Sequence, residues 1–308
     1  MTDFFQKVFR RYPIKTKRGL ELLPGLVSWT LILFPIWGSI LIPYIVAYFI
    51  LFFDVYWFYK SFSLAINAYR ASQKIKKAEQ TNWLKKLEKL SDYKKIKHVL
   101  IIPNYKENLG KLRRTIQSIA AQTLSTKSIF IVLGMEAREE DGIQKANILI
   151  REFKNKFGDI FATYHPDIGG EVKGKSSNES YASKKTYRKL IQTKIIDINF
   201  ATVSSVDADS VFDKQYFSYL SYKFLTDNLR YNKFWQSANV NHNNFWTVPA
   251  PIRIIAFFGS LWRTSLLVQK DRLISNSTYS LSFSLLKKIG FWDTDVIPED
   301  YRIFFKAF

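Results

Sequence analysis

The chain has 308 residues, 47% of them apolar and 17% aromatic, which is enough for a sizeable core in one large domain or two ordinary ones. Its formal net charge of +20 predicts an anionic partner: nucleic acid, an anionic membrane surface or a phosphorylated ligand. The absence of cysteine excludes disulfides, thiolate zinc sites and a cysteine nucleophile.

A basic segment, residues 1–21, precedes a long apolar stretch at residues 22–66. Between Leu22 and Tyr59 the only charged residue is Asp54. The stretch is about twice the ~20 residues that one helix needs to cross a bilayer. We therefore expect it to enter a membrane, although a buried helical pair of a soluble protein is an alternative.

Turn-forming residues lie near the middle of this stretch. Pro35, Gly38 and Pro43 predict a helical hairpin with helices over Leu22–Ile40 and Leu41–Leu64. Lysines and arginines flank it on both sides, and an excess of these residues marks the cytoplasmic face of a membrane. We therefore expect a multi-pass protein of the cell (inner) membrane, with the following domain in the cytoplasm.

Residues 67–97 are rich in lysine. Trp83, Leu84, Leu87 and Leu90 recur among them at helical spacing, which predicts a basic amphipathic helix lying on anionic lipid. A solvated linker helix is the alternative. Nucleic acid is not an expected partner, because no tract away from the apolar stretch combines basic residues with stacking aromatics.

Residues 98–308 alternate between short apolar runs and amphipathic stretches. Strands are expected at HVLIIPNY, SIFIVLGM, IFATYH and FATVSSV, with helices between them and after the last. This alternation predicts an α/β domain with a largely parallel sheet flanked by helices.

Two aspartates end the fourth of these runs, in VSSVDADSVF. Asp207 and Asp209 would lie at the carboxyl edge of the sheet, where parallel sheets bind ligands. Adjacent carboxylates repel, and a Mg²⁺ or Mn²⁺ ion shared with a phosphorylated ligand would offset that repulsion. Capping of the next helix is the simpler alternative.

Several motifs occur together in order: IIPNYKEN, IVLGMEAREE, HPDIGGEVKGKSSNESYA, VSSVDADSVF and VIPEDYRIFFKAF. As an ordered set they resemble the family 2 glycosyltransferases with a GT-A fold, of the membrane-embedded kind to which cellulose and hyaluronan synthases belong. The resemblance covers residues 98–308, and the preceding hairpin also fits membrane members of this family.

The resemblance implies a role for each matching position. Asp209 would bind the metal, and Asp300 would be the general base, with Pro-Glu-Asp in place of the usual Thr-Glu-Asp. Glu136 stands where the family usually has an aspartate that helps to hold the base of the nucleotide. The positions expected to contact the nucleotide sugar are Tyr105, Glu107, Glu136, Lys175, Asn178 and Asp207.

The implied reaction is a metal-dependent, inverting transfer of a sugar from a UDP- or GDP-sugar to a glycan or lipid-linked acceptor. Addition of one sugar and processive polymer synthesis are both open. A non-catalytic membrane scaffold with a degenerate nucleotide-sugar fold is the alternative function. For Asp300, the alternative is a carboxylate that stabilises a helix N-terminus.

Two further features bear on the acceptor. The segment at residues 250–266 is apolar with few charges, and could be core or an in-plane helix at the membrane surface. The Gln-x-x-Arg-Trp motif of many membrane synthases has no match, so we expect the sequence to be truncated or a short variant.

The histidines His98, His165 and His242 lack metal-ligand spacing.

Overall fold

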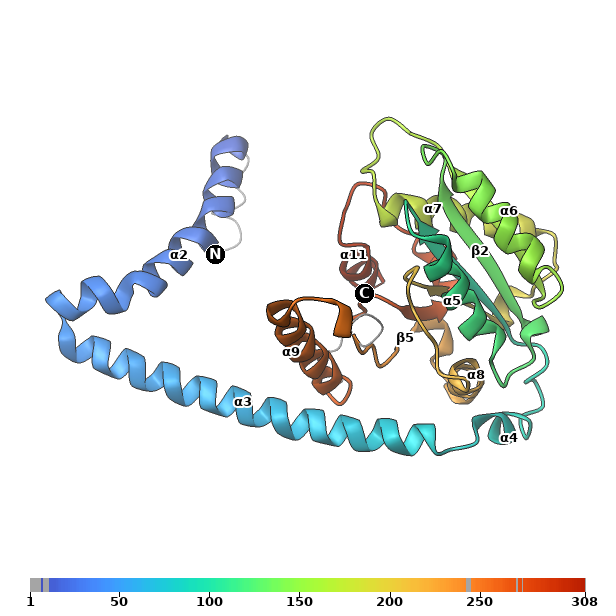
Figure 1. Cartoon of the computed structure of the whole chain (residues 1–308). Coiled ribbons are helices and arrows are strands. Elements are labelled where there is room, and N and C mark those ends of the chain that lie inside the picture. The colour runs from blue at the N-terminus through green and yellow to red at the C-terminus, as the bar shows by residue number, and fades with distance from the viewer. Residues whose placement is uncertain (1–6, 8–10, 242–244, 270, 273, 308) are drawn as a thin grey trace. The chain divides into compact units, whose positions relative to one another are not determined.

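The computed structural model describes residues 7, 11–241, 245–269, 271–272 and 274–307, so His242 lies outside the described residues. The chain divides into two compact units, Met1–Ala65 and Ile66–Phe308. Figure 1 follows the chain from the N-terminal helices in blue to the C-terminal segments in red.

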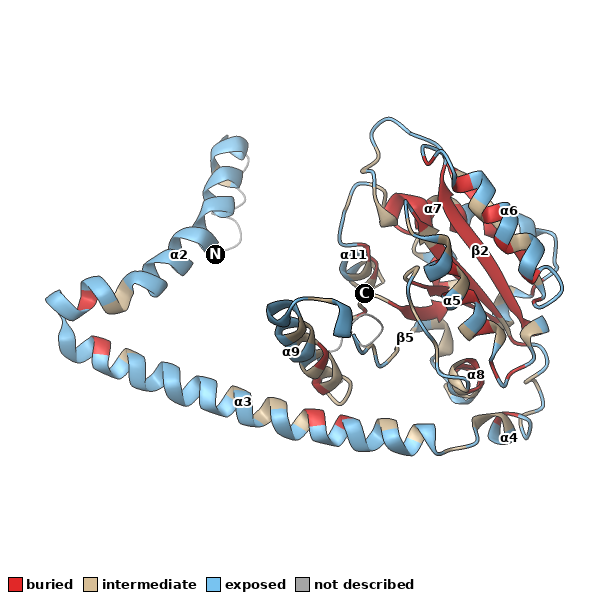
Figure 2. Ribbon diagram, in the orientation of Figure 1, coloured by how far each residue is buried: buried red, intermediate tan, exposed pale blue. Residues whose placement is uncertain are grey.

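The first unit contains the predicted pair of apolar helices. They are α2 (Pro13–Leu41) and the start of α3 (Pro43–Glu79), separated at Ile42, and both are long and apolar enough to cross a membrane. A Cβ on Gly38 would come within 2.8 Å of Val46 Cγ2, so glycine permits close approach of the two helices at the turn. Most of their remaining side chains are exposed, as Figure 2 shows in blue.

The segment after the hairpin differs from the expected amphipathic helix. Helix α3 continues to Glu79, and only a short helix, α4 (Trp83–Leu87), follows. The Trp83 ring lies 4.2 Å from the ring of Tyr219, and Leu87 is fully buried. The apolar side chains expected on lipid or in a solvated linker thus pack inside the second unit, to which α4 belongs.

The second unit is the predicted α/β fold. Its six-stranded sheet has the order β3-β2-β1-β4-β6-β5, with β1 to β4 parallel and β6 antiparallel to β4 and β5. The strands are β1 (Lys97–Asn104), β2 (Ile129–Glu136), β3 (Asp159–His165), β4 (Ala201–Ser205), β5 (Phe234–Gln236) and β6 (Tyr279–Ser282).

Helices cover both faces of this sheet because its strands are apolar on both sides. Leu100 and Ile102 of β1 point into one core, whereas Val99 and Ile101 point into the other. The first core is closed by α5 (Leu109–Ala120), α6 (Gly142–Phe153) and α8 (Tyr216–Thr226). The second is closed by α7 (Lys175–Thr186), α10 (Phe283–Lys288) and α11 (Glu299–Lys306). Strands β1, β2, β4 and β6 are among the most deeply buried elements, and β2 is seen in red in Figure 2.

A buried histidine on β1 predicts a pH-dependent stability. His98 is fully buried, its Nδ1 lies 2.6 Å from Thr202 Oγ1 and its Nε2 lies 2.7 Å from Ser221 Oγ. Burial and the neighbouring charge of Lys97 lower the pKa of His98 from 6.5 to about 3. Between these values the unfolded chain binds one more proton than the folded chain, so this contribution to stability is lost as the pH falls.

We expect His98→Gln to flatten the acid side of the stability profile. The free energy of unfolding of the wild-type chain in detergent should fall between pH 7 and pH 4 by on the order of 3 kcal/mol more than that of the variant. Denaturant titrations at a series of pH values measure this difference. Parallel profiles for the two proteins would show that His98 is not responsible.

Candidate active site at the carboxyl edge of the sheet

The sheet reverses its order between β1 and β4, and ligands bind at such a point beyond the carboxyl ends of the strands. Tyr105 follows β1, Glu136 ends β2, and Asp207 and Asp209 follow β4. Four predicted site residues therefore lie along this edge. Lys175 joins them as the first residue of α7.

Lys175 is the centre of a charge cluster. Its ammonium group donates a hydrogen bond of 2.6 Å to Asp207 Oδ1 and lies 2.8 Å from Glu299 Oε1. A third carboxylate, Glu179, lies one turn along the same helix with Oε1 4.0 Å from the ammonium. The Lys175 side chain is 24% exposed, so one side of the cluster remains open to a ligand.

Opposite effects set the pKa values in this cluster. Burial alone would lower the pKa of Lys175, but the charges of Glu179, Asp207 and Glu299 raise it above its ordinary value. Burial would raise the pKa of Asp207, yet Lys175 and a hydrogen bond from Ser277 lower it. Glu179 is fully buried, and this burial raises its pKa to about 8 against the opposing charge of Lys175. The cluster therefore combines one lysine with three carboxyl groups, and burial disfavours the ionised form of Glu179.

Asp300 reaches the same place from the N-terminus of α11. Its Oδ2 accepts a hydrogen bond of 3.1 Å from the Ser277 amide, and its Oδ1 accepts one of 2.8 Å from the Tyr301 amide. The Ser277 hydroxyl donates to Asp207 Oδ2. The predicted base and the first aspartate of the Asp-x-Asp motif thus share one hydrogen-bonding partner.

Glu136 and Asn178 lie together in a buried network behind this edge. Glu136 Oε1 accepts from Asn178 Nδ2 at 2.9 Å and lies 3.2 Å from His165 Nδ1, while its Oε2 lies 3.2 Å from Arg138 Nε. Both carboxylate oxygens of Glu136 are therefore already engaged. A Cβ at Gly134 would lie 2.4 Å from Asn178 Oδ1, which explains the glycine in this strand.

Tyr105 is the most exposed of the predicted nucleotide contacts. The guanidinium of Arg138 lies 4.1 Å from the centre of the Tyr105 ring, and Arg138 is itself held by Glu136. Tyr105 thus offers an aromatic face and Arg138 a planar cation beside it, a combination able to stack with a base.

Glu107 and Asp209 lie on an exposed rim near Lys111. Lys111 Nζ lies 3.0 Å from Glu107 Oε2, and the pKa of Lys111 is raised first by Glu107 and more weakly by Asp209. Helix α5 fixes the loop that carries Asp209, because the Thr115 hydroxyl donates to the Ala208 carbonyl at 2.8 Å.

A metal would have few protein ligands at this edge. Among the described residues, no group of three or more histidine, aspartate or glutamate side chains could hold one. Asp207 is engaged by Lys175 and Ser277, and Asp209 lies exposed two residues further along the chain. One or two carboxylates together with substrate phosphates are the usual ligands of Mg²⁺, so this donor set fits a metal that arrives with a phosphorylated ligand.

Four residues of the site were absent from the sequence predictions: Arg138, Glu179, Ser277 and Glu299. The sequence offered a signal for two of these residues, Glu179 and Glu299. Glu179 follows Lys175 at the i,i+4 spacing of an ion pair, and Glu299 adjoins Asp300. No sequence signal identified the contacts that Ser277 and Arg138 make, because their partners are distant or depend on a turn.

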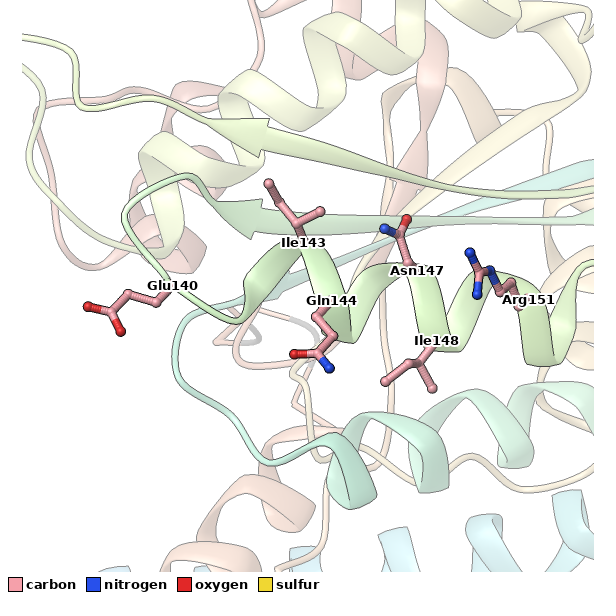
Figure 3. A pocket seen from close by; sticks show the side chains of 6 residues that line it. All are labelled: Glu140, Ile143, Gln144, Asn147, Ile148 and Arg151. Carbon is pink, nitrogen blue, oxygen red and sulfur yellow. The ribbon is translucent and has the colours of Figure 1, made fainter.

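An open hollow lies away from this cluster, on the outer face of α6. Figure 3 shows the six side chains that line it: Glu140, Ile143, Gln144, Asn147, Ile148 and Arg151. All but Glu140 come from α6. The lining includes one carboxylate, that of Glu140, and one guanidinium, that of Arg151. This hollow brings no distant motifs together, unlike the edge of the sheet.

The solved structures compared with this chain are remote in sequence. No protein-family model matches the chain, and a search of curated proteins finds no match. Among solved structures, a mannosyltransferase, PcManGT from Pyrobaculum calidifontis, in complex with GDP-Man and Mn²⁺, is similar with 16% identity and a TM-score of 0.43 over 78% of this chain. Mouse xyloside xylosyltransferase 1 is similar with 10% identity and a TM-score of 0.31, over 69% of this chain and 80% of that one.

TarS 1-349 from S. aureus, in complex with UDP-GlcNAc, is similar with 13% identity and a TM-score of 0.40 over 69% of this chain. This chain spans 62% of the mannosyltransferase and 53% of the TarS fragment. Likenesses at this level carry no argument about chemistry, which has to come from the site itself.

Proposed function

We propose that this protein is a membrane-bound, metal-dependent, inverting glycosyltransferase with a GT-A fold, of family 2. It would move a sugar from a UDP- or GDP-sugar to a glycan or lipid-linked acceptor hydroxyl. The observation that carries the proposal is the convergence of Lys175, Asp207 and Asp300, which come from three separate motifs, at the switch point of the sheet.

In this proposal the chain would supply a base, Asp300, for the acceptor and a cation, Lys175, for the leaving group. The acceptor hydroxyl would attack the anomeric carbon while its proton passes to Asp300, and the bond from that carbon to the diphosphate oxygen would break. Attack from the face opposite the leaving group inverts the anomeric centre. The Lys175 ammonium would stabilise the negative charge that develops on the diphosphate.

The charge of the cluster supports a metal. Lys175 faces Asp207 and Glu299, so the paired groups are already net negative before a diphosphate arrives. Asp209 and Asp300 add two more carboxylates nearby. A bound Mg²⁺ or Mn²⁺ held by Asp209 and the phosphates would supply Lewis-acid stabilisation of the leaving group.

The nucleotide would lie along the neighbouring strand ends. Tyr105 and Arg138 offer a stacking surface for the base, and Glu107 lies on the same rim for the ribose. Glu136 and Asn178 would lie behind this stacking surface and support it, since Glu136 pairs with Arg138 and accepts a hydrogen bond from Asn178.

A membrane location agrees with the apolar helices and with α9 (Ala250–Leu266). On α9, Ile254, Ile255, Phe258 and Trp262 are each more than half exposed, and the helix has no acidic residue. We propose that this face lies on lipid beside the acceptor. Because the chain lacks cysteine, a dye on Ile255→Cys in vesicles should be quenched by brominated lipid, and one on Gln144→Cys should not. Equal quenching at both positions would contradict this placement.

Titration calorimetry tests the proposed function. With the full chain in detergent, we expect UDP or GDP to bind in a Mn²⁺-dependent manner, and Asp209→Asn to weaken that binding by about tenfold or more. Asp295→Asn, an equivalent change at an exposed aspartate, should bind as the wild type does. The absence of metal-dependent binding for both nucleotides would favour a non-catalytic scaffold.

A further inference from the structure

Ser277 occupies a special position between the two acidic motifs. Strand β6 is antiparallel to β4, with Ser205 opposite Tyr279. Continuing this register by two residues places Ser277 opposite Asp207, at the edge where α11 brings Asp300. The register of the sheet therefore determines that a residue of this turn meets both carboxylates.

Both hydrogen-bond donors of Ser277 are used there. Its amide donates to Asp300 Oδ2 at 3.1 Å, and its hydroxyl donates to Asp207 Oδ2. Two like charges are thereby held near each other by one residue, which offsets part of their repulsion. Hydrogen bonds to charged groups are about twice as strong as those between neutral ones, so each should fix the geometry of its carboxylate.

The backbone of Ser277 is in a conformation that serine does not favour. Its φ is 53°, in the left-handed region where glycine has no steric penalty. The surrounding turn is anchored, because the Asn276 amide donates to Gln236 Oε1 at 2.8 Å and the Ser237 hydroxyl donates to the Thr278 carbonyl at 2.7 Å. Strain maintained by its surroundings is a feature of functional sites, and here the side chain that causes it binds Asp207.

We propose that Ser277 is a positioning residue that fixes the base Asp300 relative to Asp207 on the donor side. This inference rests on the proposed function. Neighbouring residues support the same arrangement: the Ser275 hydroxyl donates to the Asp300 carbonyl at 2.8 Å, and Thr278 Oγ1 lies 2.9 Å from Ser210 Oγ. Asp207 has a second partner in Lys175, whereas its link to Asp300 passes through Ser277.

Ser277→Gly separates positioning from stability. Glycine keeps the amide that binds Asp300 and adopts the left-handed conformation freely, but it removes the hydroxyl. We expect the kcat of sugar transfer to fall on the order of tenfold. The KM for the donor should change less than about threefold, since Lys175 still holds Asp207. The melting temperature should change little, because relief of the left-handed strain offsets the loss of the hydrogen bond.

A matched pair of variants tests whether the hydrogen bond is the cause. Asparagine and aspartate have similar sizes and both tolerate positive φ, but asparagine carries two N–H donors whereas an ionised aspartate has none. Ser277→Asn should therefore recover a large part of the lost kcat, and Ser277→Asp should recover none.

All variants are measured as full-length protein with Mn²⁺ and a transferable UDP- or GDP-sugar. Wild-type kcat in Ser277→Gly, or equal kcat in Ser277→Asn and Ser277→Asp, would overturn the positioning role and leave the proposed function standing. A wild-type chain that transfers no sugar from either donor class would overturn the proposed function, and the positioning role with it.

Discussion

Replacing Asp300 by asparagine is expected to lower the rate of sugar transfer by about a thousandfold, within the range that a general base contributes. Asparagine has the same shape and its Oδ1 can still accept a hydrogen bond from the Ser277 or Tyr301 amide. Its amide nitrogen cannot take a proton from the acceptor hydroxyl. Nucleotide affinity should remain at the wild-type level, because Asp207 and Lys175 are unchanged.

The measurement compares kcat with nucleotide binding in the same preparation. Asp295→Asn is the matched control, since it makes the same chemical change five residues earlier at an exposed position. Wild-type turnover in Asp300→Asn would show that another group removes the proton. Glu299 would then be the next carboxylate to test, because it already lies in the cluster.

Long apolar runs made the centre of the fold predictable. Strands β1 to β4 were expected because their residues are mostly apolar or β-branched, and β1, β2 and β4 are buried on both faces of the parallel sheet. Strands β5 and β6 were not expected. They have three and four residues, and in β6 the serines Ser280 and Ser282 are buried although their side chains are polar. Ser280 is satisfied by Ser204 of β4 at 2.7 Å, a pairing that only the sheet creates.

The site, too, has a part that the sequence predicted and a part that it did not. Asp207 and Asp209 could be placed at the carboxyl edge because their strand was recognisable. The contacts of Lys175 with Asp207 and Glu299 were not predictable from periodicity, because they join α7 to the end of β4 and to α11. The contact of Ser277 with Asp207 could not be predicted without β6, since its place opposite Asp207 follows from the antiparallel register.

The second large effect is expected from Lys175→Met, which removes the only cation that contacts Asp207 and Glu299 among the ion pairs of the described residues. Breaking a buried pair by removing one partner costs about 3–5 kcal/mol, because the other charge is left without compensation. With the side chain 24% exposed, we expect the lower end, about 3 kcal/mol, in the free energy of unfolding. Nucleotide binding should be lost as well.

The loss of unfolding free energy in Lys175→Met should depend on pH. Lys175 lowers the pKa of Asp207 in the folded wild-type chain, so its stabilising contribution is present above the unfolded value of 3.8 and is lost as the pH falls further. Without Lys175 the carboxylates are costly to keep ionised, so the variant should be weakest at high pH. Denaturant titrations at pH 5 and pH 8 should show the larger difference from wild type at pH 8.

Two further variants isolate the cause. Lys173→Met is the surface control: Lys173 Nζ lies 2.5 Å from Asp167 Oδ2, but the two side chains are 55% and 58% exposed, so the loss should stay below about 1 kcal/mol. Lys175→Met combined with Glu299→Gln should regain part of the lost stability, because one uncompensated charge is removed, while nucleotide binding stays absent. If the double variant were no more stable than Lys175→Met, the deficit would come from lost packing of the lysine side chain and not from the carboxylates that surround it.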